Sequence, residues 1–414
     1  MRRVLPIAHF CLIIILLSAS ASPAFSEDIN TLIKKASDGD PVSQFNLGSA
    51  YEKGQGVPQD FSEAEKWYRK ASESVKWFRR SAELGNSGAQ FILGWMYDHG
   101  AGVPKDAAEA VTWYRKASVN GDVRGESRLG SAYEKGEGVL QNYYEAAKWY
   151  RKAAVRGESG AQYKLGWMYA NGQGVPRDYA EAAKWFRKGA EQGESKAQLY
   201  LGFLYANGQG VSQDYAEAVT WYRKAAEQGE SKAQIAIGVM YTKGQGVPQD
   251  YAEAATWYRK AAEQGESRAT FALGLMYSNG QGVPQDYAEG VKWFRKSAEQ
   301  GMVEAQFILG IAYNKGQGVE QDDAEAVKWY RKAAEQGYYP AMNLLGASYI
   351  AGKGVPQDFV QSYFWFSLAT SRATGENYIK SNSGREHAAR MLTPENLMEA
   401  QRMTKEWEAK HPRK

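Results

Sequence analysis

One block of sequence recurs at a fixed spacing along most of the chain. It joins a Leu-Gly-x-x-Tyr segment, a Gly-x-Gly-Val loop and a Trp-Tyr-Arg-Lys-Ala segment. The first glycine of the block returns every 36 residues: Gly94, Gly130, Gly166, Gly202, Gly238, Gly274, Gly310 and Gly346. An earlier copy, Gly48, precedes Gly94 by 46 residues. A fixed period of this length predicts a repeat array, in which each unit buries its apolar face only against its neighbours. The search for function therefore moves from a globular core to a surface.

The unit from Glu194 to Gly229 indicates a helical hairpin. Its first half has apolar residues at helical spacing, and Ser195 with Gln198 predicts a capping box at its start. Gly208 predicts a left-handed helix end, after which Asp214, with a Glu three residues later, predicts the cap of a second helix. With 43% apolar and 13% aromatic residues, the chain has ample material for a long helical core.

The glycine of the Leu-Gly segment lies inside the predicted first helix. Gly202 costs that helix about 1 kcal/mol relative to Ala. Because the glycine returns in every unit, we expect a second helix to cross so closely that no side chain fits.

The first 26 residues differ from the rest. A basic start, an apolar run from Val4 to Leu17 and a small-x-small site at Ala24-Phe25-Ser26 predict a signal peptide and export to the periplasm or beyond. Cleavage after Ala19-Ser20-Ala21 and an uncleaved membrane anchor are the alternatives. The only cysteine, Cys11, lies in this segment, so a processed chain carries no thiol.

The remainder divides into three parts. Residues 27–39 predict a capping helix, 40–373 nine repeats and 374–414 a C-terminal helical cap, in which Pro394 begins a helix. Such polar-faced caps keep a solenoid soluble. Oligomeric state is left open.

The first repeat is extended by ten residues, since Trp67-Tyr68-Arg69-Lys70-Ala71 is followed by Trp77-Phe78-Arg79-Arg80-Ser81. Ten helical residues turn the apolar stripe about 80° short of whole turns. This predicts a kink or loop near 72–75. A further repeat that lost most of its residues is an equally good account.

These motifs resemble the Sel-1-like repeat family, a branch of the tetratricopeptide-like α-solenoids, over residues 40–373. The resemblance implies an all-α, right-handed superhelix of helix–turn–helix repeats used for protein–protein contact. It also implies that bacterial members are often exported, and that some act in envelope signalling or host interaction. A cysteine-rich branch is linked with β-lactam binding, but the per-repeat cysteines of that branch are absent here.

No motif predicts catalysis, a cofactor or a metal. The Gly-x-Gly loop follows a helix and lacks the lysine of a phosphate loop, and the Asp and Glu of the second helix suffice as caps. There is no Gly-x-Ser-x-Gly or Ser-x-x-Lys nucleophile motif, and His99, His387 and His411 are far apart. The net charge of +4 comes from interleaved charges, which argues against a nucleic-acid stripe.

Specificity is expected where the units differ on the side of the first helix opposite its core. Two series mark this side, those of Tyr200 and Phe203. The candidate protein-binding residues on this concave wall are aromatic or basic: Trp95, Arg128, Lys164, Trp167, Tyr200 and Phe203. Such residues suit a peptide or helix ligand. The alternative is that they only pack between adjacent first helices, and the aliphatic residues of later units favour packing.

The sequence therefore predicts an exported, non-enzymatic scaffold that binds a protein or peptide and has no integral membrane segment once processed. A periplasmic regulator of an envelope sensor or secretion component is a narrower alternative. A hydrolase acting on β-lactam or cell-wall material is the alternative of a different class.

Overall fold

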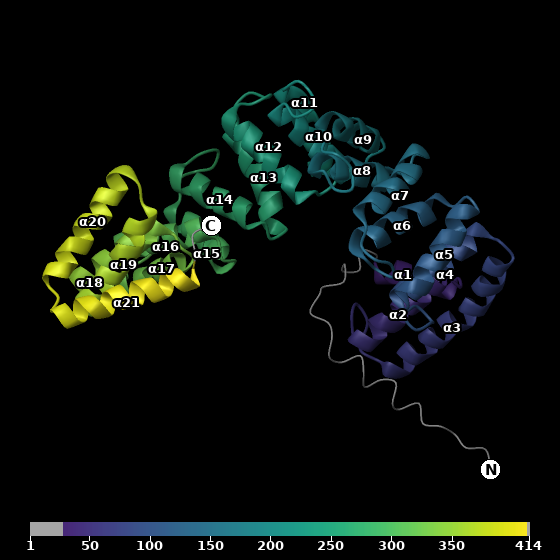
Figure 1. Cartoon of the computed structure of the whole chain (residues 1–414), viewed down its shortest axis with the longest axis horizontal. Coiled ribbons are helices and arrows are strands. Elements are labelled where there is room, and N and C mark those ends of the chain that lie inside the picture. Colours follow the sequence, from purple (N-terminus) through teal and green to yellow (C-terminus); the bar gives the residue numbers. More distant parts are fainter. Residues whose placement is uncertain (1–27, 412–414) are drawn as a thin grey trace, which may run out of the picture. The chain divides into compact units, whose positions relative to one another are not determined.

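The computed structural model describes residues 28–411. The described residues form 21 α-helices and no β-strand, in two compact units, residues 1–177 and 178–414, each considered by itself (Figure 1). The predicted signal peptide, Cys11 and the last three residues lie outside the described part.

Nine repeats of two helices follow one another along the chain. Consecutive helices pack side by side within each unit, as hairpins in three repeats of unit 1 and five repeats of unit 2. The first helix of each repeat, helix A, has thirteen residues: α2 Pro41–Lys53, α4 Ser87–His99, α6 Val123–Lys135, α8 Ser159–Asn171, α10 Ser195–Asn207, α12 Ser231–Lys243, α14 Ser267–Asn279, α16 Val303–Lys315 and α18 Tyr339–Ala351. The second, helix B, is: α3 Phe61–Glu83, α5 Ala107–Val119, α7 Tyr143–Val155, α9 Tyr179–Glu191, α11 Tyr215–Glu227, α13 Tyr251–Glu263, α15 Tyr287–Glu299, α17 Asp323–Glu335 and α19 Phe359–Arg372. The predicted all-α solenoid is confirmed.

Three further helices flank the hairpins: α1 Ile29–Ser37, α20 Gly375–Arg390 and α21 Pro394–Lys410. In unit 1, α1 packs on α2, whereas α20 and α21 both pack on α19 in unit 2. Thr393 caps α21, with Pro394 as its first residue.

The turns follow from glycine and aspartate chemistry. Gly208 ends α10 with φ of 64°, the left-handed region that glycine tolerates. A Cβ on Gly210 would lie 2.1 Å from the carbonyl carbon of Tyr179, so that loop can lie against α9 only with glycine there. The Asp214 carboxylate then accepts from two backbone N–H groups of α11, as predicted.

The predicted capping box at Ser195 is wrong. Ser195 is the first helical residue, and Glu194 is the N-cap and makes no side-chain cap. Gln198 is buried and donates from Nε2 to the Ala190 carbonyl of the preceding helix, 3.0 Å away. The glutamine therefore joins two helices instead of closing the start of its own.

The predicted close crossing of helices A and B is confirmed. A Cβ on Gly202 would lie 2.8 Å from Cδ1 of Tyr222 and 3.1 Å from the Ala218 carbonyl oxygen, which no real side chain tolerates. The same contact recurs in unit 1, where a Cβ on Gly130 would lie 2.6 Å from Tyr150.

Of the kink or loop predicted near 72–75, the loop is wrong, because α3 is one uninterrupted helix of 23 residues. Its first half pairs with α2 through Tyr68, and its second half contacts the loop glycine Gly102 through Ala71 and Val75. The apolar stripe of the second half is rotated around the helix relative to that of the first half, as ten extra helical residues require. Trp77 is left 76% exposed, whereas the equivalent Trp113 is 4% exposed.

Candidate functional site

The six predicted wall residues lie on helices A of both units. Unit 1 holds Trp95, Arg128, Lys164 and Trp167, and unit 2 holds Tyr200 and Phe203. Only Arg128 and Phe203 are exposed, and the other four are half-buried.

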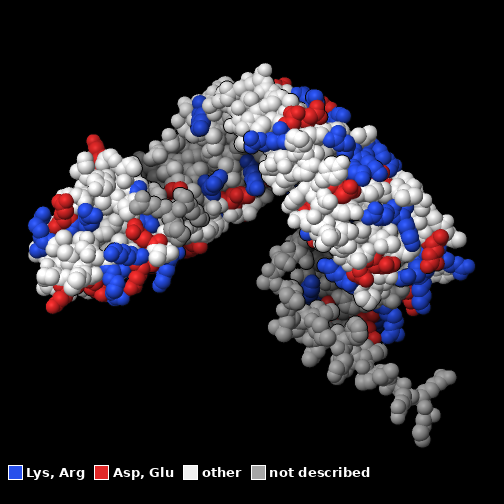
Figure 2. All heavy atoms as spheres, in the orientation of Figure 1, with Lys and Arg blue, Asp and Glu red and all other residues white. Residues whose placement is uncertain are grey.

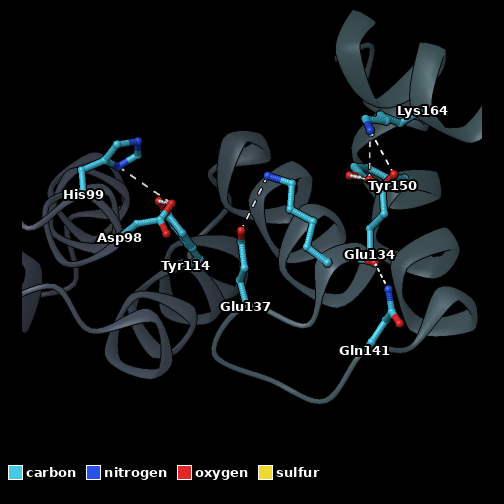
Figure 3. Close-up of polar contacts among 9 residues, drawn as sticks. Asp98, His99, Tyr114, Glu134, Glu137, Gln141, Tyr150 and Lys164 are labelled. Atoms are coloured by element: carbon cyan, nitrogen blue, oxygen red, sulfur yellow. Dashed lines mark hydrogen bonds and ion pairs between the residues drawn. The ribbon is translucent and has the colours of Figure 1, made fainter. Parts of the chain in front are cut away.

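A polar pocket of about 330 Å³ lies in unit 1 at the C-terminal end of α4, beside α5 and α6. Among the predicted residues, Arg128 lines it. Other charged and polar lining residues are Asp98, His99, Lys105, Tyr114, Ser131, Lys135 and Glu137. Figure 3 shows Asp98 and Tyr114 directed toward one another, with Glu137 on the loop after α6.

Two of the residues that line this pocket, Asp98 and Tyr114, form a hydrogen bond. Tyr114 donates its hydroxyl proton to Asp98 over 3.3 Å. Burial and then the Asp98 charge raise the pKa of Tyr114, and the Arg128 charge opposes this rise. Tyr114 is therefore a neutral donor at physiological pH. Arg128 makes no hydrogen bond or ion pair with any described residue.

In the next repeat, the residues at the positions of Asp98, Tyr114 and Arg128 include a basic residue that is paired. Glu134, Tyr150 and Lys164 are each 36 residues beyond Asp98, Tyr114 and Arg128. Lys164 Nζ lies 3.0 Å from both carboxylate oxygens of Glu134, and the Tyr150 hydroxyl donates to the same carboxylate over 2.6 Å (Figure 3). The predicted residue Lys164 is thus neutralised within the chain.

Trp95 does not line the pocket but packs against one of its lining residues. Its ring stacks on His99 with centroids 4.2 Å apart, and it contacts two successive core clusters of unit 1. The His99 Nδ1–H donates to the Trp95 carbonyl over 2.9 Å. These contacts give Trp95 a packing role beside any role in binding.

The two predicted residues of unit 2 differ from one another. Tyr200 stacks on Phe186 with centroids 5.6 Å apart, and burial, followed by the Glu230 charge, raises its pKa. Tyr200 therefore belongs to the packing. Phe203 is 45% exposed and stays available to a ligand.

Sequence reasoning missed the polar half of the pocket, namely Asp98, Tyr114, Lys135 and Glu137. A signal was present, because an acid precedes a helix-B tyrosine by 16 residues in three successive repeats: Glu52 and Tyr68, Asp98 and Tyr114, Glu134 and Tyr150. His99, to which the sequence assigned no role, is exposed and lines the pocket.

Charge is distributed without a dominant sign. Lys and Arg side chains alternate with Asp and Glu over the face shown in Figure 2. Within residues 28–411, no group of His, Cys, Asp and Glu side chains is arranged to hold a metal ion. No helix of this described part is long and apolar enough to cross a membrane.

Comparison with known proteins agrees with the hairpin array. The Sel1 repeat family profile matches ten segments: 41–74, 72–86, 87–122, 123–157, 159–194, 195–230, 231–266, 267–302, 303–338 and 340–373. The short match at 72–86 falls on the second half of α3. A comparison with curated proteins finds no match.

Two solved structures are similar over most of their length. The crystal structure of a Sel1 repeat protein from Oxalobacter formigenes is 35% identical, with a TM-score of 0.59 and coverage of 74% of this chain and 89% of that one. That of a protective antigen of uropathogenic Escherichia coli with an SLR fold is 33% identical, with a TM-score of 0.48 and coverage of 93% and 95%.

The repeats, their close-crossing glycines and their packing define an α-solenoid of helical hairpins. The chain belongs to the Sel1 repeat family. Proteins of this fold are generally non-enzymatic scaffolds for protein–protein interaction.

Proposed function

We propose that this chain is an exported, non-enzymatic scaffold that binds a protein partner on the helix-A face of unit 1. The observation that carries the proposal is the pocket of about 330 Å³ that contains the exposed and unpaired Arg128 and is lined by His99, on which Trp95 stacks. Aromatic and arginine side chains dominate the energy of many protein interfaces. The later repeats have aliphatic residues in place of Arg128: Ala236, Ala272, Ile308 and Leu344.

Site-specific photocrosslinking tests the face that binds. A photoreactive amino acid is placed at Ser131 or Lys135, which line the pocket, and at Thr112 or Lys148, which are exposed on helices B. In the producing cell, we expect the helix-A positions to yield one crosslinked protein band and the helix-B positions to yield none. Crosslinks only from Thr112 and Lys148 would move the interface to helix B.

Export is tested by the mass of the protein recovered from the envelope fraction. We expect the loss of the first 21 to 26 residues, because their pattern is that of a signal peptide. Retention of Met1 would contradict this. A periplasmic regulator remains the narrower form of the proposal, and identification of the crosslinked protein decides it.

Hydrolysis of β-lactams or cell-wall material has no structural observation in its favour. Hydrolysis of nitrocefin by the purified protein would support this alternative, provided that variants of the proposed binding face hydrolyse it equally well.

A further inference from the structure

We infer that the Arg128 pocket is a subsite for a single carboxylate of an acidic peptide segment, with Arg128 as the residue that pairs with it. This inference rests on the proposed function and names the chemistry of the partner. It starts from the comparison of two successive repeats, in which the same position carries Arg128 and Lys164.

The repeat with Lys164 shows what that position binds when its partner is within the chain. Lys164 holds a carboxylate, Glu134, at 3.0 Å to both oxygens, and the tyrosine of helix B donates to the same group. For Arg128 the corresponding acid is Asp98, whose side chain is one methylene shorter. The tyrosine bond remains, but the basic residue makes no ion pair with any described residue.

The guanidinium of Arg128 thus lacks the anion that its counterpart has. Its five N–H donors lie in a planar fork that matches a carboxylate in two parallel hydrogen bonds. It is exposed at the pocket, so a ligand can reach it without unfolding. Lys105 also lines this pocket and adds positive charge, whereas the Lys135 charge is offset by Glu137 at 3.7 Å.

The other acids of the pocket limit the charge of the ligand. Asp98 and Glu137 both line it. They repel a phosphate, which carries close to two negative charges, more strongly than a single carboxylate. The volume of about 330 Å³ is near the lower end for a small-molecule site and suits one or two side chains. A peptide that lies on helix A and inserts one acid fits both limits.

Two sources can supply the carboxylate, an Asp or Glu side chain or the free end of a chain. Two arrays of random nine-residue peptides, one amidated and one with free carboxyl ends, are probed with the full processed chain. We expect retained peptides to be enriched in Asp or Glu on the amidated array if the side chain binds. Retention confined to the free-end array identifies the chain end. The inference is overturned if peptides are retained without preference for acidic side chains or free carboxyl ends. It is also overturned if no peptide is retained.

The best-retained peptide is then measured by fluorescence anisotropy against matched variants. Arg128→Gln is expected to weaken binding about tenfold or more, equivalent to about 1.4 kcal/mol. Arg268→Gln, which removes an exposed arginine of unit 2, is expected to leave the affinity unchanged. Replacement of the peptide carboxylate by an amide is expected to weaken wild-type binding as much as Arg128→Gln, and to have little further effect on that variant.

Asp98→Glu gives a sharper test, because it removes no charge. The longer side chain is expected to reach Arg128 as Glu134 reaches Lys164, so it competes with the peptide and lowers its affinity several-fold. Circular dichroism checks that each variant is folded. Unchanged affinity in Arg128→Gln overturns the inference, as does displacement of the peptide by equimolar inorganic phosphate. If the partner still crosslinks from Ser131 in either case, the proposed function stands while the carboxylate subsite fails.

Discussion

The last turn of helix A differs between the first three repeats of unit 1 and the repeats of unit 2, although the close helix crossing is the same. Three repeats of unit 1 carry an acid there, Glu52, Asp98 and Glu134, and each accepts a hydrogen bond from a helix-B tyrosine. Unit 2 carries no acid at this position, where its residues are Ala206, Thr242, Ser278, Asn314 and Ile350. The glycine that lets helices A and B cross is present in both units. Packing therefore constrains the frame, and the polar lining of helix A is free to diverge for recognition.

The largest expected effect tests whether the frame is shared. Gly94→Leu in unit 1 and Gly238→Leu in unit 2 place a Cβ 2.7 Å from Tyr114 and 2.8 Å from Tyr258, respectively. Each change overpacks a helix crossing and is expected to cost about 3 kcal/mol of unfolding free energy, measured in urea. Hydrogen exchange of the affected repeat should rise first, since each repeat depends on its neighbours.

Gly88→Leu is the control, because the nearest atoms to its Cβ are the ends of the Asn86 and Arg124 side chains at 3.4 and 3.9 Å. This change should cost less than about 1 kcal/mol. Unequal losses at Gly94 and Gly238 would show that the two units do not share one frame.

An intermediate effect is expected where one repeat of unit 1 replaces a polar bridge by an ion pair. In unit 2, Gln336 donates to Gln306 over 2.8 Å and to the Gly301 carbonyl over 3.1 Å. In unit 1, Arg156 takes this role and pairs with Glu126, which is 7% exposed. Arg156→Gln alone leaves a buried carboxylate without its cation and is expected to cost about 2 kcal/mol.

Adding Glu126→Gln should recover most of that loss, because the two changes recreate the bridge of unit 2. The four proteins of this double-mutant cycle are compared by thermal and urea unfolding. A double variant as unstable as Arg156→Gln would mean that the two bridges are not equivalent.

The sequence predicted the array, its hairpins and the role of Gly202 well, because a period of 36 residues leaves few ways to bury the apolar residues. It failed at Gln198 and α3, where a contact with a neighbouring helix overrides a local preference. It identified Arg128 but treated Lys164 as equivalent. Whether such a cation is paired depends on one methylene in a side chain 30 residues earlier, Asp98 or Glu134. Helical periodicity carries no information on the distance between the acid and the cation.

The smallest effect concerns the tyrosine hydroxyls that distinguish the units. Tyr150→Phe removes a bond to the Glu134 carboxylate and is expected to cost about 1.5 kcal/mol, as for hydrogen bonds to charged groups. Tyr222 occupies the same position in unit 2 but makes no hydrogen bond with a described residue, so Tyr222→Phe should change stability by less than about 0.5 kcal/mol. Both rings keep their packing against a glycine of helix A, Gly130 or Gly202, so the difference isolates the hydroxyl. Urea midpoints of the two variants measure it. Equal losses would mean that the acids of unit 1 contribute nothing through their tyrosines, and that the lining of helix A does not distinguish the units energetically.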